Sequence, residues 1–336
     1  MTYLTGEVTV VHDWTKIDFT NFVYSGFRFN GTAAGATTTI NGATVSKIVG
    51  VTIDSVINEN TTTIDEDLIL LGNPQPTFSS NIKGASTGEY QSKYSFYFEG
   101  NDKRQFFNFG KPSSVNDLDS SITVSTYMRV DGDHSVDGYA IENYLSSNGF
   151  GLGYKNTGDE WRFRIGVTTS GLEDILTNTL SPKTTGANTW INITGTWNTD
   201  TKEMKIYVNG SLENTRTLAL TDVLDPTTDD LRIGGGTTST GEMKGMVNNI
   251  VIWNTALTDE EVLTHYNNGN PYNVLLDGPN SNNIVFWSKV GDNSSWNGSD
   301  QWTIIDAVNN FNGLSSTAGG GAFAPMTYTS RVKDAP

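Results

Sequence analysis

The sequence contains no cysteine among its 336 residues, and it has only three histidines and nine prolines. Without cysteine, disulfide bonds, cysteine-ligated zinc and thiol catalysis are all excluded. The histidines, at positions 12, 134 and 265, are too far apart in sequence to suggest a histidine-based metal site. No apolar run approaches the roughly 18 residues that a membrane-spanning helix needs, so no membrane insertion is expected. The fold must therefore be held together by strand pairing and core packing alone.

Basic residues are also scarce. The sequence has 21 Lys and Arg but 37 Asp and Glu, so its formal net charge is −16. Such an acidic surface repels phosphate backbones, so nucleic acid is not an expected partner.

The segment Met1–Glu7 lacks the basic and apolar stretches of a secretory signal. A surface-protein composition without an export signal is typical of a protein that leaves the cell inside an assembled particle. A mature form without its leader, or a cytoplasmic β-protein, would show the same combination of composition and missing signal.

What the chain has instead is Gly, Thr, Ser and Asn, together with aromatic residues, which make up 11% of it. These types favour turns and strands over helix interiors, and they indicate an all-β protein. We expect a β-rich N-terminal attachment or assembly region over residues 1–85. A sandwich domain is expected over 86–270, and a loop-rich segment over 271–336 that packs on a neighbour or on another subunit.

The clearest strand signals lie in the central region. Trp161, Phe163 and Ile165 alternate with Arg162 and Arg164, and this period of two predicts a strand with one core face and one solvent face. Similar alternation runs through residues 94–98, 122–128, 191–197 and 204–208. Asn209-Gly210 separates two such runs and predicts a tight hairpin with a type I′ turn.

One short helix is expected near the end of the sandwich. Thr258 followed by Glu261 forms a capping-box pattern, and we expect Val262, Leu263 and Tyr266 to face the sheet.

The order of these features resembles the concanavalin-A-like, laminin-G-like superfamily. Seven fragments carry the resemblance in the family's order: 94–102, 122–129, 190–197, 205–210, 231–235, 245–253 and 255–262. The resemblance implies a jelly-roll sandwich closed by the short helix. In the flanks, residues 282–293 and 331–336 are similar to the tail of laminin-G-containing virion proteins of marine bacteriophages.

Catalysis is not expected from this sequence. Glycoside hydrolases with this fold place paired carboxylates on one strand. Here the acidic cluster beginning at Asp65 lies outside the sandwich, and the one beginning at Asp259 lies at the start of the helix. No Ser-His-Asp set and no phosphate-binding glycine loop are evident. The sequence therefore favours a non-enzymatic protein.

Two kinds of binding site remain open. Calcium binds six to eight oxygen ligands, which the loops of this superfamily often supply, and the candidate ligands here are Asn101, Asp102, Asp131, Asp133 and Asp137. The alternative is that these Asp and Gly residues only form turns. Tyr144 and Tyr154, in or near loops and short strands, are candidates for stacking on sugar rings, whereas the alternation around Trp161 places that residue in the core.

Taken together, the sequence favours a structural virion protein, in a capsid decoration, fibre or tail. The expected partners are other virion proteins, sister copies in an oligomer and host surface glycans. One alternative is a free calcium-dependent lectin-like module at a cell surface or outside the cell. A glycoside hydrolase is the third.

Overall fold

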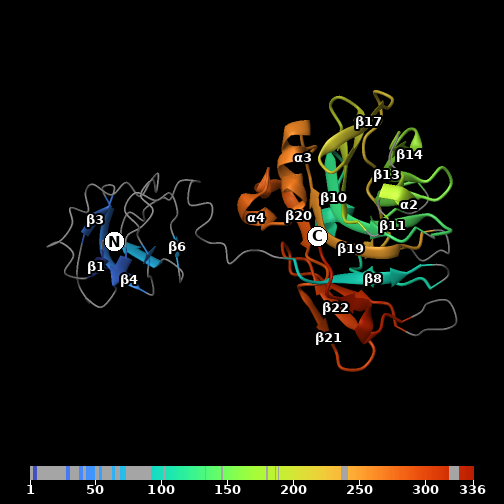
Figure 1. Ribbon diagram of the computed structural model, residues 1–336. Coiled ribbons are helices and arrows are strands. Elements are labelled where there is room, and N and C mark those ends of the chain that lie inside the picture. The colour runs from blue at the N-terminus through green and yellow to red at the C-terminus, as the bar shows by residue number, and fades with distance from the viewer. Residues whose placement is uncertain are drawn as a thin grey trace. The chain divides into compact units, whose positions relative to one another are not determined.

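We analysed a computed structural model of the protein (Figure 1). It describes residues 92–100, 103–132, 134–144, 147–178, 181–185, 187, 189–235, 241–317 and 325–336, together with seven short strands before residue 73. The backbone contacts divide the chain into two compact units, Met1–Tyr90 and Gln91–Pro336.

The N-terminal unit is described only through its strands. The strands are β1 (Tyr3–Thr5), β2 (Arg28–Asn30), β3 (Thr38–Ile40), β4 (Ala43–Val49), β5 (Ile53–Asp54), β6 (Thr63–Ile64) and β7 (Ile69–Gly72). β1 pairs with β2 in parallel, whereas β3–β4–β7 and β5–β6 are antiparallel.

The second unit is a sandwich of two antiparallel sheets (Figure 1). The strands of the back sheet, in spatial order, are β17 (Ser211–Thr217), β16 (Glu203–Val208), β15 (Ile191–Asn198), β10 (Ile122–Val130), β19 (Lys244–Trp253), β8 (Ser95–Glu99) and β24 (Arg331–Val332), and β20 (Ile284–Ser288) also pairs with β19. The strands of the front sheet are β14 (Gly171–Leu176), β13 (Glu160–Val167), β12 (Phe150–Lys155), β11 (Gly138–Glu142), β18 (Arg232–Ile233), β9 (Phe107–Asn108), β23 (Asn312–Ser315), β22 (Trp302–Ile305) and β21 (Ser294–Trp296). The predicted all-β sandwich is confirmed.

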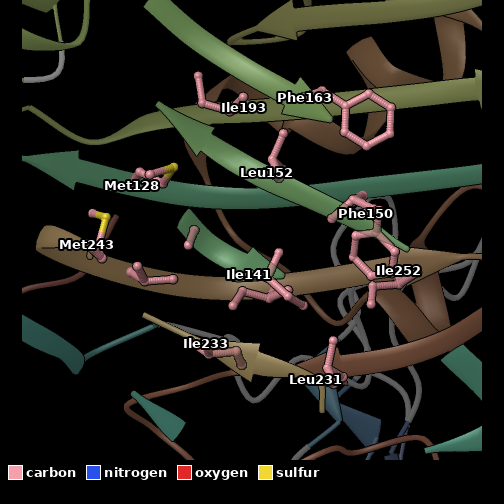
Figure 2. Close-up of a cluster of buried hydrophobic side chains, with 14 of the residues drawn as sticks. Met128, Ile141, Phe150, Leu152, Phe163, Ile193, Leu231, Ile233, Met243 and Ile252 are labelled. Carbon is pink, nitrogen blue, oxygen red and sulfur yellow. The ribbon is translucent and has the colours of Figure 1, made fainter. Parts of the chain in front are cut away.

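The core lies between the two sheets and follows the period-two pattern of the sequence. Figure 2 shows Phe150, Leu152 and Phe163 of the front sheet among Ile193 and Ile252 of the back sheet, and all five side chains are at most 1% exposed. Burying side chains of this size from both sheets provides the main driving force for closing the sandwich.

The predicted hairpin and helix are both present. Asn209 and Gly210 join β16 to β17 with φ angles of 50° and 76°, as a type I′ turn requires. Helix α3 (Asp259–Tyr266) begins at Thr258, which forms the capping box with Glu261. The orientation of α3 differs from the prediction at Leu263, which is 56% exposed, and His265 turns inward with 1% exposure instead.

Six shorter helical segments accompany α3 among the described residues of the second unit. They are α1 (Ser113–Asn116), α2 (Pro182–Thr185), α4 (Val274–Asp277) and the 3-10 turns near residues 267, 281 and 328. Within the described part of the chain, no helix is long and apolar enough to cross a membrane.

The segment after residue 270 differs from the loop-rich segment expected. Its strands β20 and β24 pair with the back sheet, and β23 pairs with β9 so that β21–β23 extend the front sheet. The residues from 271 onward therefore supply strands to both layers of the sandwich, within the second compact unit.

Candidate functional site

A row of polar residues crosses the front sheet on the face that points away from the core. Asp174, Arg164, Gly151, Glu142 and Arg232 are successive register partners on β14, β13, β12, β11 and β18. Side chains that are directly opposite each other in neighbouring strands project from the same face of a sheet. This outer face therefore gathers charged groups from strands that are far apart in the sequence.

Two glycines of β12 allow close contacts with β11 and its loop: Gly151 leaves room for aromatic rings, and Gly153 for the β11 backbone. A Cβ atom at Gly151 would lie 2.8 Å from the Tyr139 ring and 3.4 Å from the Tyr144 ring, and a Cβ at Gly153 would lie 2.7 Å from the Tyr139 Cα. Tyr144 comes from the loop that joins β11 to β12, and it folds back over Gly151. We call the resulting group the arginine–tyrosine cluster: Tyr139, Glu142, Tyr144, Arg162, Arg164 and Arg232.

Stacking contacts connect the members of the cluster. The Arg162 guanidinium lies over the Tyr139 ring at 4.6 Å, and the Arg164 guanidinium lies over the Tyr144 ring at 5.3 Å. The two tyrosine rings meet edge to face with their centroids 5.2 Å apart. Cation–π contacts of this kind hold guanidinium planes in fixed orientations.

Each arginine also pairs with a carboxylate. Arg164 donates two hydrogen bonds to Asp174, from Nε to Oδ1 at 2.6 Å and from Nη2 to Oδ2 at 2.7 Å. The Arg162 Nη1 donates to Asp137 at 3.0 Å, and the Arg232 Nη1 donates to Asp229 at 3.1 Å. These ion pairs position the guanidinium groups and balance their charge.

Glu142 lies among the three arginines but is itself only 4% exposed. Burial raises the pKa of its carboxyl group to about 8, although the charge of Arg232 acts in the opposite direction. At neutral pH the group is therefore mostly protonated, so it can both donate and accept a hydrogen bond. Burial raises the pKa of the Tyr144 hydroxyl, and the charge that Glu142 carries once it is ionised acts in the same direction.

Some donors of the cluster have no hydrogen-bond partner among the described residues. They are the Nε and Nη2 groups of Arg162, which is 2% exposed, and the Nε of Arg232, which is 6% exposed. Buried polar groups are satisfied in the great majority of folded proteins, by protein, water or ligand. Partly exposed Tyr144 and Arg164 lie beside these buried donors on the same face.

The cluster combines donors, a protonated carboxyl group and a tyrosine ring, which is the chemistry needed to recognise hydroxyl-rich molecules. Hydrolysis of a glycosidic bond needs a second carboxylate beside the acid. The neighbouring carboxylates, those of Asp137, Asp174 and Asp229, are each held by an arginine. The arrangement therefore favours binding over catalysis.

The two predicted sugar-stacking residues have different surroundings. Tyr144 belongs to the cluster and is partly exposed. The prediction for Tyr154 is wrong, because its ring is 0% exposed and its hydroxyl accepts a hydrogen bond from the Lys244 backbone at 3.0 Å. Tyr154 shares the inward face of β12 with Phe150 and Leu152, as the period of two requires.

The predicted calcium ligands are only partly described, because Asn101, Asp102 and Asp133 lie outside the described residues. Asp131 accepts a hydrogen bond of 2.6 Å from the Tyr97 hydroxyl. Asp137 accepts from the Asn156 backbone at 2.8 Å and pairs with Arg162, so its carboxylate does not fit a calcium ligand as it stands. Within the described residues, no three carboxylate or histidine groups are placed to hold a metal ion.

Sequence reasoning missed most of the cluster. The alternation that buries Trp161 and Phe163 already implies that Arg162 and Arg164 share the outer face. The alternating glycines at 151 and 153 indicate a strand face without side chains. Nothing in the local sequence indicates that Glu142 and Arg232 are neighbours.

Comparison with known proteins supports the fold. Residues 101–263 match a laminin G family model described as the concanavalin A-like lectin/glucanases superfamily. No match was found among the curated proteins with which the sequence was compared.

Three solved structures illustrate the likeness, each at a TM-score below 0.5. A Bacteroides ovatus protein assigned to carbohydrate binding has 16% identity over 82% of this chain and 70% of its own, with a TM-score of 0.48. A heptameric pentraxin from Limulus polyphemus has 16% identity over 52% of this chain and 82% of its own, with a TM-score of 0.40. The sialidase CBM40 module of Ruminococcus gnavus, bound to α2,3 sialyllactose, has 13% identity over 52% of this chain and 97% of its own. Its TM-score is 0.41.

The family match and the two antiparallel sheets agree in the same part of the chain. Residues 101–263 are therefore similar in sequence to this superfamily, and the second unit has the two-sheet β-sandwich that the similarity predicts.

Proposed function

We propose that this protein is a non-catalytic glycan-binding protein whose contact surface is the arginine–tyrosine cluster. The observation that carries the proposal is that Arg162 and Arg232 keep buried donors without a partner among the described residues, beside the partly exposed Tyr144 and Arg164. Sugars offer hydroxyl acceptors to guanidinium groups and C–H faces to tyrosine rings, so both parts of the cluster have a role.

We further propose that the protein is a structural component of a virion and displays the sandwich toward the host. The proposal follows from the resemblance noted for residues 282–293 and 331–336 to the tail of bacteriophage virion proteins. In this proposal residues 1–85 attach the protein to the particle or to sister copies. Mass spectrometry of purified particles tests the location, and absence of the protein from them would contradict it.

Binding is tested on an array of defined neutral and acidic oligosaccharides, with the intact protein and single variants. Tyr144→Ala and Arg164→Ala should each weaken binding about tenfold or more, because each removes a direct contact. Arg129→Ala is the matched control, since Arg129 lies on β10 of the back sheet and pairs with Asp334. Unchanged binding by both cluster variants would overturn the proposed site.

The absence of catalysis is tested with the same oligosaccharides. After long incubation, a bound oligosaccharide should be recovered intact, as judged by mass spectrometry. Release of shortened products that disappear in Glu142→Gln would instead identify Glu142 as a general acid.

A further inference from the structure

A groove lies on the same front sheet, at the strands that the C-terminal segment contributes. It has a volume of about 560 Å³, which is within the range of small-ligand sites. Its lining includes Phe106, Asn108, Phe109, Gln301, Asn312 and Leu314. The groove therefore combines β9 with β23 and the residues that flank β22.

The chemistry of the lining differs from that of the arginine–tyrosine cluster. None of the described lining residues carries a charge, and the polar groups are amides and hydroxyls. Leu314 is 43% exposed and, with the two phenylalanines, supplies apolar surface. An uncharged lining with both apolar faces and neutral hydrogen-bonding groups fits a neutral polyhydroxylated ring better than an anion.

The polar groups of the groove are held in place by the strands below them. The Ser315 hydroxyl accepts from the Trp302 backbone at 2.9 Å, and the Gln301 Nε2 donates to the Ser315 carbonyl at 3.1 Å. The side-chain amide of Asn312 makes no hydrogen bond with a described residue, and Asn312 is exposed. A ligand in the groove would therefore contact the hydrogen-bonded Gln301 and Ser315 on one side and the available side-chain amide of Asn312 on the other.

The groove is continuous with the arginine–tyrosine cluster. Arg232 is the register partner of Asn108, and Asn108 is the register partner of Leu314, so the three side chains share the outer face. The Asn108 amide donates to Asp230 at 2.9 Å, and Asp230 in turn accepts from Arg232 at 3.3 Å. Asn108 thus links the last arginine of the cluster to the wall of the groove.

We propose that this groove is a second subsite that binds a neutral saccharide unit of the glycan held by the arginine–tyrosine cluster. The protein then recognises an oligosaccharide along the face of the front sheet rather than a single sugar. Strand β9 lies inside the family-matched residues 101–263, whereas β22 and β23 lie outside them, so the C-terminal segment contributes one side of the groove. The proposal rests on the proposed glycan-binding function.

The test uses the full-length protein and calorimetry with the linear cello-, malto- and lacto-oligosaccharide series and their sialylated or uronic-acid-bearing counterparts. Affinity should rise with chain length in at least one series. Leu314→Asp and Asn312→Ala should each lower the affinity for the longer members about tenfold, because they remove a contact in the groove. Leu220→Asp is the control for the introduced charge, since Leu220 is 86% exposed.

The two proposals fail in different ways. If an acidic sugar binds through Tyr144 and Arg164 but chain length and the groove variants have no effect, the subsite is refuted and the proposed function stands. If a neutral oligosaccharide binds and only the groove variants weaken it, the groove is a saccharide site but the cluster is not. If no saccharide binds, or an extended peptide displaces the probe from the groove with higher affinity, the saccharide subsite is overturned.

Discussion

Replacing Glu142 by glutamine should change how the stability of the sandwich depends on pH. Burial raises the pKa of this carboxyl group from an ordinary value of 4.5 to about 8 in the folded protein. Between those two pH values the unfolded chain releases the proton while the folded protein keeps it. The wild-type protein therefore loses stability as the pH rises from about 4.5 to about 8, and the loss amounts to about 5 kcal/mol when complete.

Glu142→Gln keeps the shape and hydrogen-bonding capacity of the protonated carboxyl group but has no proton to lose. We expect the variant and the wild-type protein to be similarly stable near pH 4.5, and the variant to be several kcal/mol more stable near pH 9. Comparing the two proteins at each pH cancels the contributions of the other titrating groups.

Urea unfolding monitored by tryptophan fluorescence measures the difference at a series of pH values. Seven of the eight tryptophans lie after residue 90, so the signal reports on the sandwich. Glu260→Gln, at an exposed position of α3, controls for the chemical change itself. A stability difference between Glu142→Gln and the wild-type protein that stays constant from pH 4.5 to 9 would refute the buried, protonated state of Glu142.

Four further predictions concern other parts of the sandwich. Burial lowers the pKa of His265 from 6.5 to about 4, so stability should fall as the pH drops through that window, and His265→Gln should remove about 3 kcal/mol of this loss in urea titrations. Thr258→Ala should cost about 1 kcal/mol by removing the N-cap of α3, whereas an equal cost for Thr264→Ala, at an exposed position of the same helix, would argue against the capping role. Gly151→Ala should destabilise the sandwich by about 1–3 kcal/mol and weaken glycan binding, because the new Cβ would meet the Tyr139 ring at 2.8 Å; wild-type stability and binding would contradict the described packing. If the predicted calcium site exists, calcium at about 1,000 times its dissociation constant should add about 4 kcal/mol of stability, and an unchanged melting temperature with and without calcium would count against it.

Several local features of the fold were predictable because they depend on nearby residues only. The Asn209-Gly210 turn follows from the positive φ angles that these residues tolerate, and the capping box of α3 follows from Thr258 and Glu261. The error at Leu263 has a simple cause. Helical periodicity defines which residues share a face, but His265 could be buried toward the sheet because Ser125, on a distant strand, offers its hydroxyl 3.1 Å from the His265 Nε2.

The prediction for Tyr154 was wrong for a different reason. Its position two residues after Leu152 and four after Phe150 already places it on the inward face of β12, and this alternation should have outweighed its closeness to a turn. The candidate site as a whole was less predictable. Only Tyr144 of its six residues was named as a ligand candidate, although Arg162 and Arg164 were already assigned to a solvent face.

The sequence by itself determined which side chains face the core and which face outward, because the two-residue period of a strand is a property of the local backbone. Only the tertiary structure decided which outward residues become neighbours. Glu142 meets Arg232 because β11 pairs with β18, and Asn108 meets Leu314 because β9 pairs with β23. Strand pairing uses backbone hydrogen bonds that every residue except proline can make, so the choice of partner strand depends on how the whole core closes.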